Sequence, residues 1–246
     1  TKSAKAGKMR VGFTTSYGID EVNMFPDVQR TYSQETGGVY DPESFWPSWG
    51  STTEAAKAID PTHPDRIYHH YKQGYQQGNQ FRASVNMSGG TEAALLSSSI
   101  SYFKQEGTIP NTDYKNISVR LNGKFKFSDK LQFSPTINYI NSGGYRANAD
   151  RYNESLTYWS PRWNVKDYMN PDGTMISHGG NNNPIYGTAT NKLRDNVNRI
   201  IANGLVSYKP IKWLNVDYRL GIDYYSDFRR YTAPGPIGVE GEVPYE

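Results

Sequence analysis

The chain has 246 residues, no cysteine, and 27 basic against 24 acidic side chains. The lack of cysteine excludes disulfide frameworks, thiolate zinc sites and cysteine nucleophiles, and a formal net charge of +3 is too small to indicate a nucleic acid as partner. A mean hydropathy of −0.77, with no apolar run near the roughly 20 residues that a spanning helix needs, excludes helical membrane proteins but not membrane barrels.

Apolar and polar residues alternate with period two in seven segments, and no stretch keeps a helical period over three turns. Along the first segment, Val11, Phe13 and Tyr17 fall on one side and Arg10 and Asp20 on the other. The pattern predicts an all-β, antiparallel chain. In chain order, the predicted strands lie near 9–20, 79–89, 94–104, 117–127, 131–140, 199–208 and 213–225.

The connections between these strands are of two kinds. Tight turns are expected at 90–92, 128–130 and 209–212, and long connections near 21–78, 105–116 and 141–198. Since short and long connections alternate, one end of the sheet is predicted to be smooth and the other to be crowned by loops. A tail from Arg229 to Glu246 contains three prolines and is predicted to be unpaired.

A soluble β-sandwich and a membrane barrel both give alternating strands. The apolar stripes run for about 10 residues, the length that a tilted strand needs to cross a bilayer, whereas soluble strands are typically about 5–6 residues long. Aromatic residues also gather near both strand ends, as at the two interfaces of a membrane. Those near the smooth end are Phe125, Phe127, Phe133, Tyr208 and Trp213, and those near the crowned end are Tyr17, Phe81, Tyr102, Tyr139 and Tyr224.

These features favour a transmembrane β-barrel over the sandwich. In hydrocarbon every strand edge must be paired, so seven strands are expected to be one part of a larger barrel. The arginines on the polar sides are then predicted to face the lumen or a plug inside it, and they are Arg82, Arg120, Arg199 and Arg219.

Three segments carry a resemblance to a known family. The stretch 86–92 (NMSGGTE), the stretch 102–107 (YFKQEG) and the stretch 119–122 (VRLN) resemble, in this order and spacing, the early barrel strands of SusC/RagA-type TonB-dependent transporters. The pair 113–114 (DY), between the last two stretches, belongs to the same pattern. The stretches 8–11 and 65–81 are similar to the same family. The resemblance covers most of the chain, and the two longest loops match poorly.

The resemblance implies a bacterial outer-membrane barrel of about 22 strands, of which residues 1–246 would be the N-terminal part, with loops 21–78 and 141–198 extracellular. It implies TonB-dependent import of oligosaccharides or peptides, a SusD/RagB-type surface lipoprotein as partner, contact with outer-membrane lipid, and a plug through which the TonB system acts. The plug and the later strands are expected to be absent from this chain.

Large aromatic residues on the polar loops are the candidates for contact with substrate or with the lipoprotein. Exposed rings of this kind mark contact surfaces, although they could equally pack the loops into small cores. The candidates are Trp46, Trp49, Tyr158, Trp159 and Trp163.

Catalytic and metal sites have weaker support. His63, His69 and His70 lie near Asp60 and Asp65, but adjacent histidines point apart on a regular element, so no metal is expected. The stretch 170–173 (NPDG) resembles part of a calcium loop but lacks its further carboxylates and is predicted to be a β-turn. No cofactor and no enzymatic activity are expected. The alternatives to the importer are a secreted carbohydrate-binding β-sandwich and a β-rich glycan hydrolase.

Overall fold

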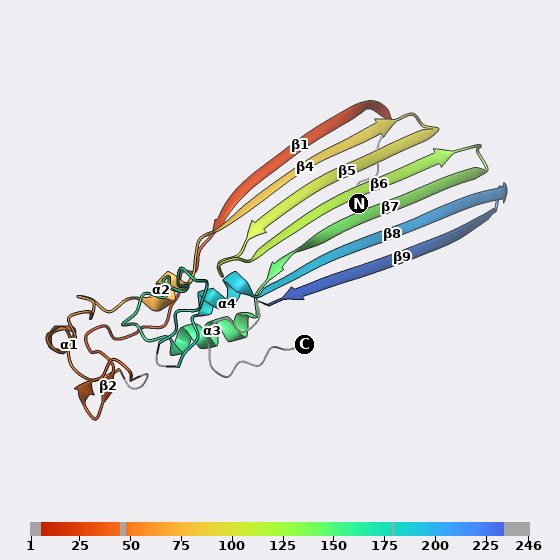
Figure 1. The fold of residues 1–246 in the computed structure, drawn as a ribbon. Coiled ribbons are helices and arrows are strands. Elements are labelled where there is room, and N and C mark those ends of the chain that lie inside the picture. The colour runs from red at the N-terminus through yellow and green to blue at the C-terminus, as the bar shows by residue number, and fades with distance from the viewer. Residues whose placement is uncertain (1–5, 45–47, 179, 234–246) are drawn as a thin grey trace.

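One antiparallel sheet dominates the computed structural model, which describes residues 6–44, 48–178 and 180–233. Each long strand pairs with the next one along the chain, so that β1 and β9 form the two edges (Figure 1). The seven strands are β1 (Gly7–Asp20), β4 (Gly78–Gly90), β5 (Ala94–Glu106), β6 (Asp113–Lys126), β7 (Leu131–Arg146), β8 (Lys192–Ile211) and β9 (Leu214–Thr232). The prediction of an all-β, antiparallel fold is confirmed.

The last strands are longer than their sequence pattern predicts. β8 begins at Lys192 rather than near 199, and β9 continues to Thr232 rather than ending near 225. The prediction that an unpaired tail starts at Arg229 is therefore wrong, because Arg229 pairs with Asp195 of β8.

The crowned end also differs in one respect. The connection between β5 and β6, predicted to be long at 105–116, spans only 107–112. It is closed by a hydrogen bond of 2.9 Å from the Gly107 amide to the Thr112 carbonyl, and the Thr112 hydroxyl donates to the Ile109 carbonyl at 2.7 Å. The crown is therefore built from two long loops rather than three.

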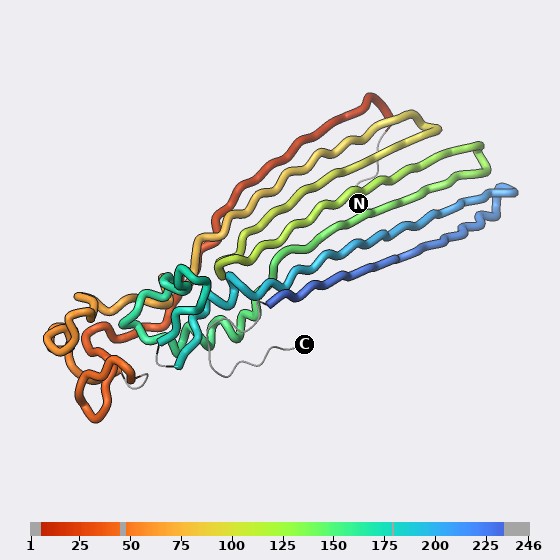
Figure 2. The backbone as a smooth tube through the Cα atoms, viewed as in Figure 1, coloured from red at the N-terminus to blue at the C-terminus, as the bar shows by residue number. Residues whose placement is uncertain are grey.

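These two loops fold into a cap of short elements at one end of the sheet (Figure 2). The first loop holds β2 (Glu35–Thr36), β3 (Val39–Tyr40), α1 (Thr53–Ile59) and α2 (His70–Gly74), and the second holds α3 (Ala149–Tyr158) and α4 (Pro184–Thr190). Local signals explain where the helices begin: the side chains of Thr52, Asn148 and Asn183 accept hydrogen bonds from the first-turn amides of α1, α3 and α4.

The buried core lies in the cap and not under the sheet. In the described part of the chain, no apolar residue of the seven long strands is buried; the buried apolar residues are Tyr40, Ala56, Ile67, Tyr152, Leu156, Trp159, Val165, Met175, Ile185 and Tyr186. The described residues form no second sheet other than the β2–β3 hairpin. The alternative of a β-sandwich is therefore wrong. Among these residues, no helix is long and apolar enough to cross a membrane.

Candidate functional site

The register of the sheet collects most of the apolar residues of all seven strands on one side, here called the apolar face. Each residue in one row across the sheet pairs directly with the next, and the row consists of Phe13, Val85, Ile100, Val119, Tyr139, Ile200 and Tyr224. This face is open: Phe13 is 68% exposed and Leu220 is 66% exposed. A continuous exposed apolar surface across seven strands indicates an apolar environment around it.

The apolar band crosses the strands obliquely. On β1 it reaches Ile19, which lies six residues beyond Phe13. On β9 the unbroken run of apolar residues ends at Tyr224, in the same row as Phe13, because Ser226 follows on this face. The other border moves in the same direction, from Met9 on β1 to Leu214 on β9. A shift of about six residues of ~3.3 Å over six strand spacings of ~4.8 Å corresponds to a strand tilt of about 35°, which matches the ~35–45° of transmembrane barrels.

Aromatic side chains mark both borders of this band. At the cap end, the Tyr17 hydroxyl donates to Asn79 Oδ1 at 2.5 Å, and the Tyr139 hydroxyl donates to Asn198 Oδ1 at 2.9 Å. These tyrosines therefore direct their polar ends toward amides just beyond the band, as at a membrane interface.

The turn end of the band is lined by phenylalanine rings that lie over glycines. A Cβ atom at Gly123 would come within 2.6 Å of the Phe125 ring, and one at Gly204 within 2.9 Å of the Phe133 ring. Glycine is therefore needed at both positions so that the rings can lie against the sheet.

The four predicted arginines all lie on the opposite, polar face. Arg199 forms a bidentate pair with Asp223, with nitrogen–oxygen distances of 2.9 and 2.5 Å. Arg82 lies over the Phe103 ring, with Cζ 4.9 Å from the ring centroid. Arg120 stands opposite Ser99 and Asn138, and Arg219 opposite Leu205. The four do not converge on one point, so they line a surface rather than form a single site.

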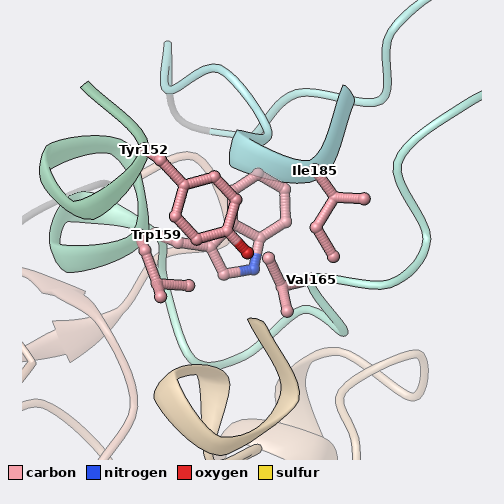
Figure 3. Packing of buried hydrophobic residues seen from close by; sticks show 5 residues of the cluster. Tyr152, Trp159, Val165 and Ile185 are labelled. Carbon is pink, nitrogen blue, oxygen red and sulfur yellow. The ribbon is translucent and has the colours of Figure 1, made fainter. Parts of the chain in front are cut away.

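A small apolar core holds the second loop of the cap together (Figure 3). It consists of Tyr152, Leu156, Trp159, Val165 and Ile185. Trp159 is only 2% exposed, and its Nε1 donates to the Trp163 carbonyl at 2.9 Å. Burial raises the pKa of Tyr152 well above its usual range, and its hydroxyl donates to the Gly74 carbonyl, which ties α3 to α2.

A buried ion pair joins the first loop to the second. Arg162, 7% exposed, contacts Asp60, and the Tyr40 hydroxyl donates to the same carboxylate at 2.8 Å. Hydrogen bonds from Thr62 and Tyr40, together with the Arg162 charge, hold the pKa of Asp60 well below its usual range. Burial, with the Asp60 hydrogen bond, raises the pKa of Tyr40 to about 12. The cap is thus one packed unit rather than two independent loops.

Ser33 and His63 resemble a nucleophile and its base, because Ser33 Oγ lies 2.6 Å from His63 Nε2. Both residues are 2% exposed, and His63 Nδ1 faces the Pro64 carbonyl at 2.8 Å instead of a carboxylate. Burial lowers the pKa of His63. Since no substrate can reach this pair in the folded cap, its role is structural.

The predicted contact aromatics fall into different environments. Trp49 is 66% exposed and packs on Tyr32, with ring centroids 5.7 Å apart, and Tyr158 is 42% exposed. Trp163 is half-buried and stacks on His178 at 4.0 Å, while Trp46 lies outside the described residues. We assign Trp159 to the cap core because it is buried, and the contact prediction now depends mainly on Trp49 and Tyr158.

The predicted metal candidates do not gather. His69 accepts a hydrogen bond from the Lys72 amide and caps α2, and His70 is buried with neither ring nitrogen partnered. Within the described ranges, no three His, Asp or Glu side chains are placed to hold a metal ion. The predicted turn at 170–173 is confirmed, since the Gly173 amide donates to the Asn170 carbonyl at 3.0 Å and Asp172 accepts from Thr174.

Sequence reasoning missed two groups of residues. The role of Arg162 depends on contact between loops a hundred residues apart, for which the sequence holds no local signal. The second group lies on the polar face with Arg82 and consists of Phe103, Tyr114 and Arg146. The alternation of side chains along each strand could have placed these residues on that face.

Comparison with known proteins supports the fold. No family model matches the chain, and no curated protein matches it. Solved structures of the RagAB peptide importer in its closed-closed and open-open states are similar, with TM-scores of 0.66 and 0.65 and sequence identities of 15% and 16%. A further structure, of the RagAB peptide transporter, has a TM-score of 0.63 at 17% identity. The alignments cover 96%, 92% and 92% of this chain, but it spans only 29–30% of the length of those chains.

Proposed function

We propose that residues 1–246 form the N-terminal part of a transmembrane β-barrel in the bacterial outer membrane, and that the barrel imports oligosaccharides or peptides in a TonB-dependent manner as part of a SusCD-type complex. The observation that carries this proposal is the oblique apolar band on one face of a single-layered sheet. A tilted strand in a bilayer requires such a band, and the RagAB-like fold supports the same interpretation.

The two sheet edges support a larger assembly. β1 and β9 each pair on one side only in the described part of the chain. An unpaired backbone edge costs several kcal/mol per polar group in hydrocarbon, so both edges require neighbouring strands. The length of the RagAB chains, of which this chain spans less than a third, is in keeping with strands contributed by a longer polypeptide.

In this proposal the cap projects from the outer surface and the tight turns face the periplasm. The lipoprotein partner would contact the cap through exposed aromatic residues, foremost Trp49 and Tyr158, and the TonB system would act through a plug outside this chain. Passage rather than bond chemistry is the proposed activity, because the one Ser–His pair in the described cap is sealed from solvent.

The experiment is an uptake measurement on cells with and without the full-length gene. Labelled oligopeptides, tested first because of the RagAB likeness, and labelled oligosaccharides would be supplied with the TonB system active or deleted. We expect the protein in the outer-membrane fraction and uptake that requires both the gene and TonB. A protein that stays soluble without detergent, or uptake unchanged by gene deletion, would refute the proposal.

A further inference from the structure

Charges are segregated on the polar face of the sheet. The polar face of β4, β5, β6 and β7 carries no Asp or Glu, and the acids of this face lie on the flanking strands, as with Asp20 on β1 and Asp195 on β8. The cations of these four strands on the same face are Arg82, Arg120, Lys124, Lys126 and Arg146. Lys126 and Arg146 pair with Asp129 and Asp195, and the Asp20 carboxylate reaches over to Gln80 and Gln105. Arg82, Arg120 and Lys124 have no carboxylate partner among the described residues, so the sector keeps a net positive charge that complements an anion.

At the cap end of this sector, two arginines and two rings form a continuous array across four strands. Arg82 Cζ lies 4.9 Å from the Phe103 centroid, the Phe103 and Tyr114 centroids are 6.2 Å apart, and Arg146 Cζ lies 5.1 Å from the Tyr114 centroid. Because each guanidinium rests on a ring, its direction is restricted, and its N–H groups remain at its edge for a ligand.

The two arginines differ in whether they already pair with a carboxylate of the protein. Arg146 pairs with Asp195 at 3.1 Å, whereas Arg82 is exposed and has no carboxylate partner among the described residues. The neighbouring amides are committed, because Gln80 and Gln105 donate to Asp20 at 2.6–2.8 Å. Arg82 is thus the free donor of this region.

A hollow of about 110 Å³ adjoins Arg82, and its walls are formed by Ser16, Tyr17, Gly18, Gln80, Arg82 and Phe103. Gly18 contributes no side chain to this hollow. A Cβ atom at Gly18 would meet only one neighbour within 4 Å, Gln80 Cβ at 3.8 Å, so the space beside it is open. The hollow is large enough for a carboxylate group.

From this geometry we propose that the Arg82–Phe103–Tyr114–Arg146 array is a recognition site for the carboxylate side chains of acidic peptides, with Arg82 as the primary contact. The inference rests on the proposed function, because it places this face inside the barrel and the array near its outer mouth. A planar carboxylate matches the guanidinium fork. Arginine covers one face of Phe103 and one face of Tyr114, which reduces the ring area open to a stacking sugar.

The test measures peptide binding to the full-length protein in detergent. The probes are a terminally blocked pentapeptide with two glutamates and its analogue with two glutamines. We expect the wild type to prefer the acidic peptide by about tenfold to a hundredfold. Arg82→Gln should remove this preference without changing affinity for the glutamine peptide, and Arg82→Lys should keep part of it. Lys130→Gln, the same loss of charge in the β6–β7 turn, should bind as the wild type does.

Several outcomes would overturn the proposal: a wild type that binds both peptides equally or neither, an Arg82→Gln variant that loses both equally, or an acidic oligosaccharide bound in an Arg82-dependent manner where the peptide is not. Gly18→Val provides a second test, because it fills the hollow without removing a charge and should also weaken acidic-peptide binding. Membrane insertion is measured on the same preparations. Insertion without peptide preference refutes this site alone, whereas failure to insert refutes the proposed function.

Discussion

Leucine-to-arginine substitutions can measure directly what surrounds the apolar face. Leu121 lies near the middle of the band on β6, is 49% exposed, and pairs with Ser98 and Ile137. At a bilayer midplane, arginine costs about 2–4 kcal/mol, which is roughly a thirtyfold or greater change in the folding equilibrium. On a half-exposed sheet in water, the same change would stay within about 0.5 kcal/mol.

The depth of each site follows from the tilt of the strands. At a tilt of about 35° and a rise of ~3.3 Å per residue, successive residues of a strand differ in depth along the membrane normal by about 2.7 Å. Leu131 stands at the start of β7, beside the tight turn, so the matched substitution Leu131→Arg should cost only about 0–1 kcal/mol. Asn122→Arg, the neighbour of Leu121 on the polar face, is the control for strand propensity.

The assay is reversible denaturant unfolding of the full-length protein in lipid vesicles. We expect Leu121→Arg to lower the free energy of unfolding by about 2–4 kcal/mol, and both other variants to lower it by less than about 1 kcal/mol. Equal costs at Leu121 and Leu131, or a negligible cost at Leu121, would refute the assignment of this face to lipid.

Three further predictions concern the cap. Trp159→Ala should destabilise the cap by about 3–5 kcal/mol because it empties the core, which limited proteolysis of the cap would detect while the barrel stays intact; unchanged proteolysis would contradict this. Trp49→Ala should weaken lipoprotein binding by about 1–2 kcal/mol without altering cap proteolysis, and unchanged binding would remove Trp49 from the interface. Burial lowers the pKa of both His178 and His70 from 6.5 to about 4, so an opened cap binds protons that the closed cap does not. Cap stability should therefore be complete above pH 6.5 and fall as the pH drops toward 4. Amide protection factors from hydrogen exchange that stay constant across this window would contradict the prediction, and His178→Phe should reduce the loss of protection at low pH.

The strands could be predicted from the sequence only where the two faces of the sheet meet different surroundings. On β6, the contrast between Leu121 and Asn122 marks each face, and its predicted range is close to the observed one. The first residues of β8, such as Arg194, Asp195 and Asn196, are polar on both sides. If water surrounds both faces of the first residues of β8, polar residues are favoured on both faces. The period-two pattern then disappears from the sequence although the strand continues.

The cap was less predictable because its helices are short. α1 has 7 residues and α2 has 5, too few for a helical period to emerge. Capping side chains precede α1, α3 and α4, and Asn183 followed by Pro184 at the start of α4 is the most distinctive of these local signals. The burial of the loop tryptophans could not be predicted from the neighbouring sequence. Trp49 and Trp159 both lie in polar loops, and only contacts between distant segments decide which of them is buried.

The most direct test of the account is a spin-label scan of β6. Single labels at positions 117 to 122 of the full-length protein in lipid vesicles would be exposed to oxygen, which concentrates in the bilayer, and to a water-soluble nickel complex. If the apolar face meets lipid, accessibility alternates strictly along β6, with the odd positions accessible to oxygen and the even positions accessible to nickel. Odd positions that are protected from oxygen, or that meet nickel as readily as the even ones do, would contradict it.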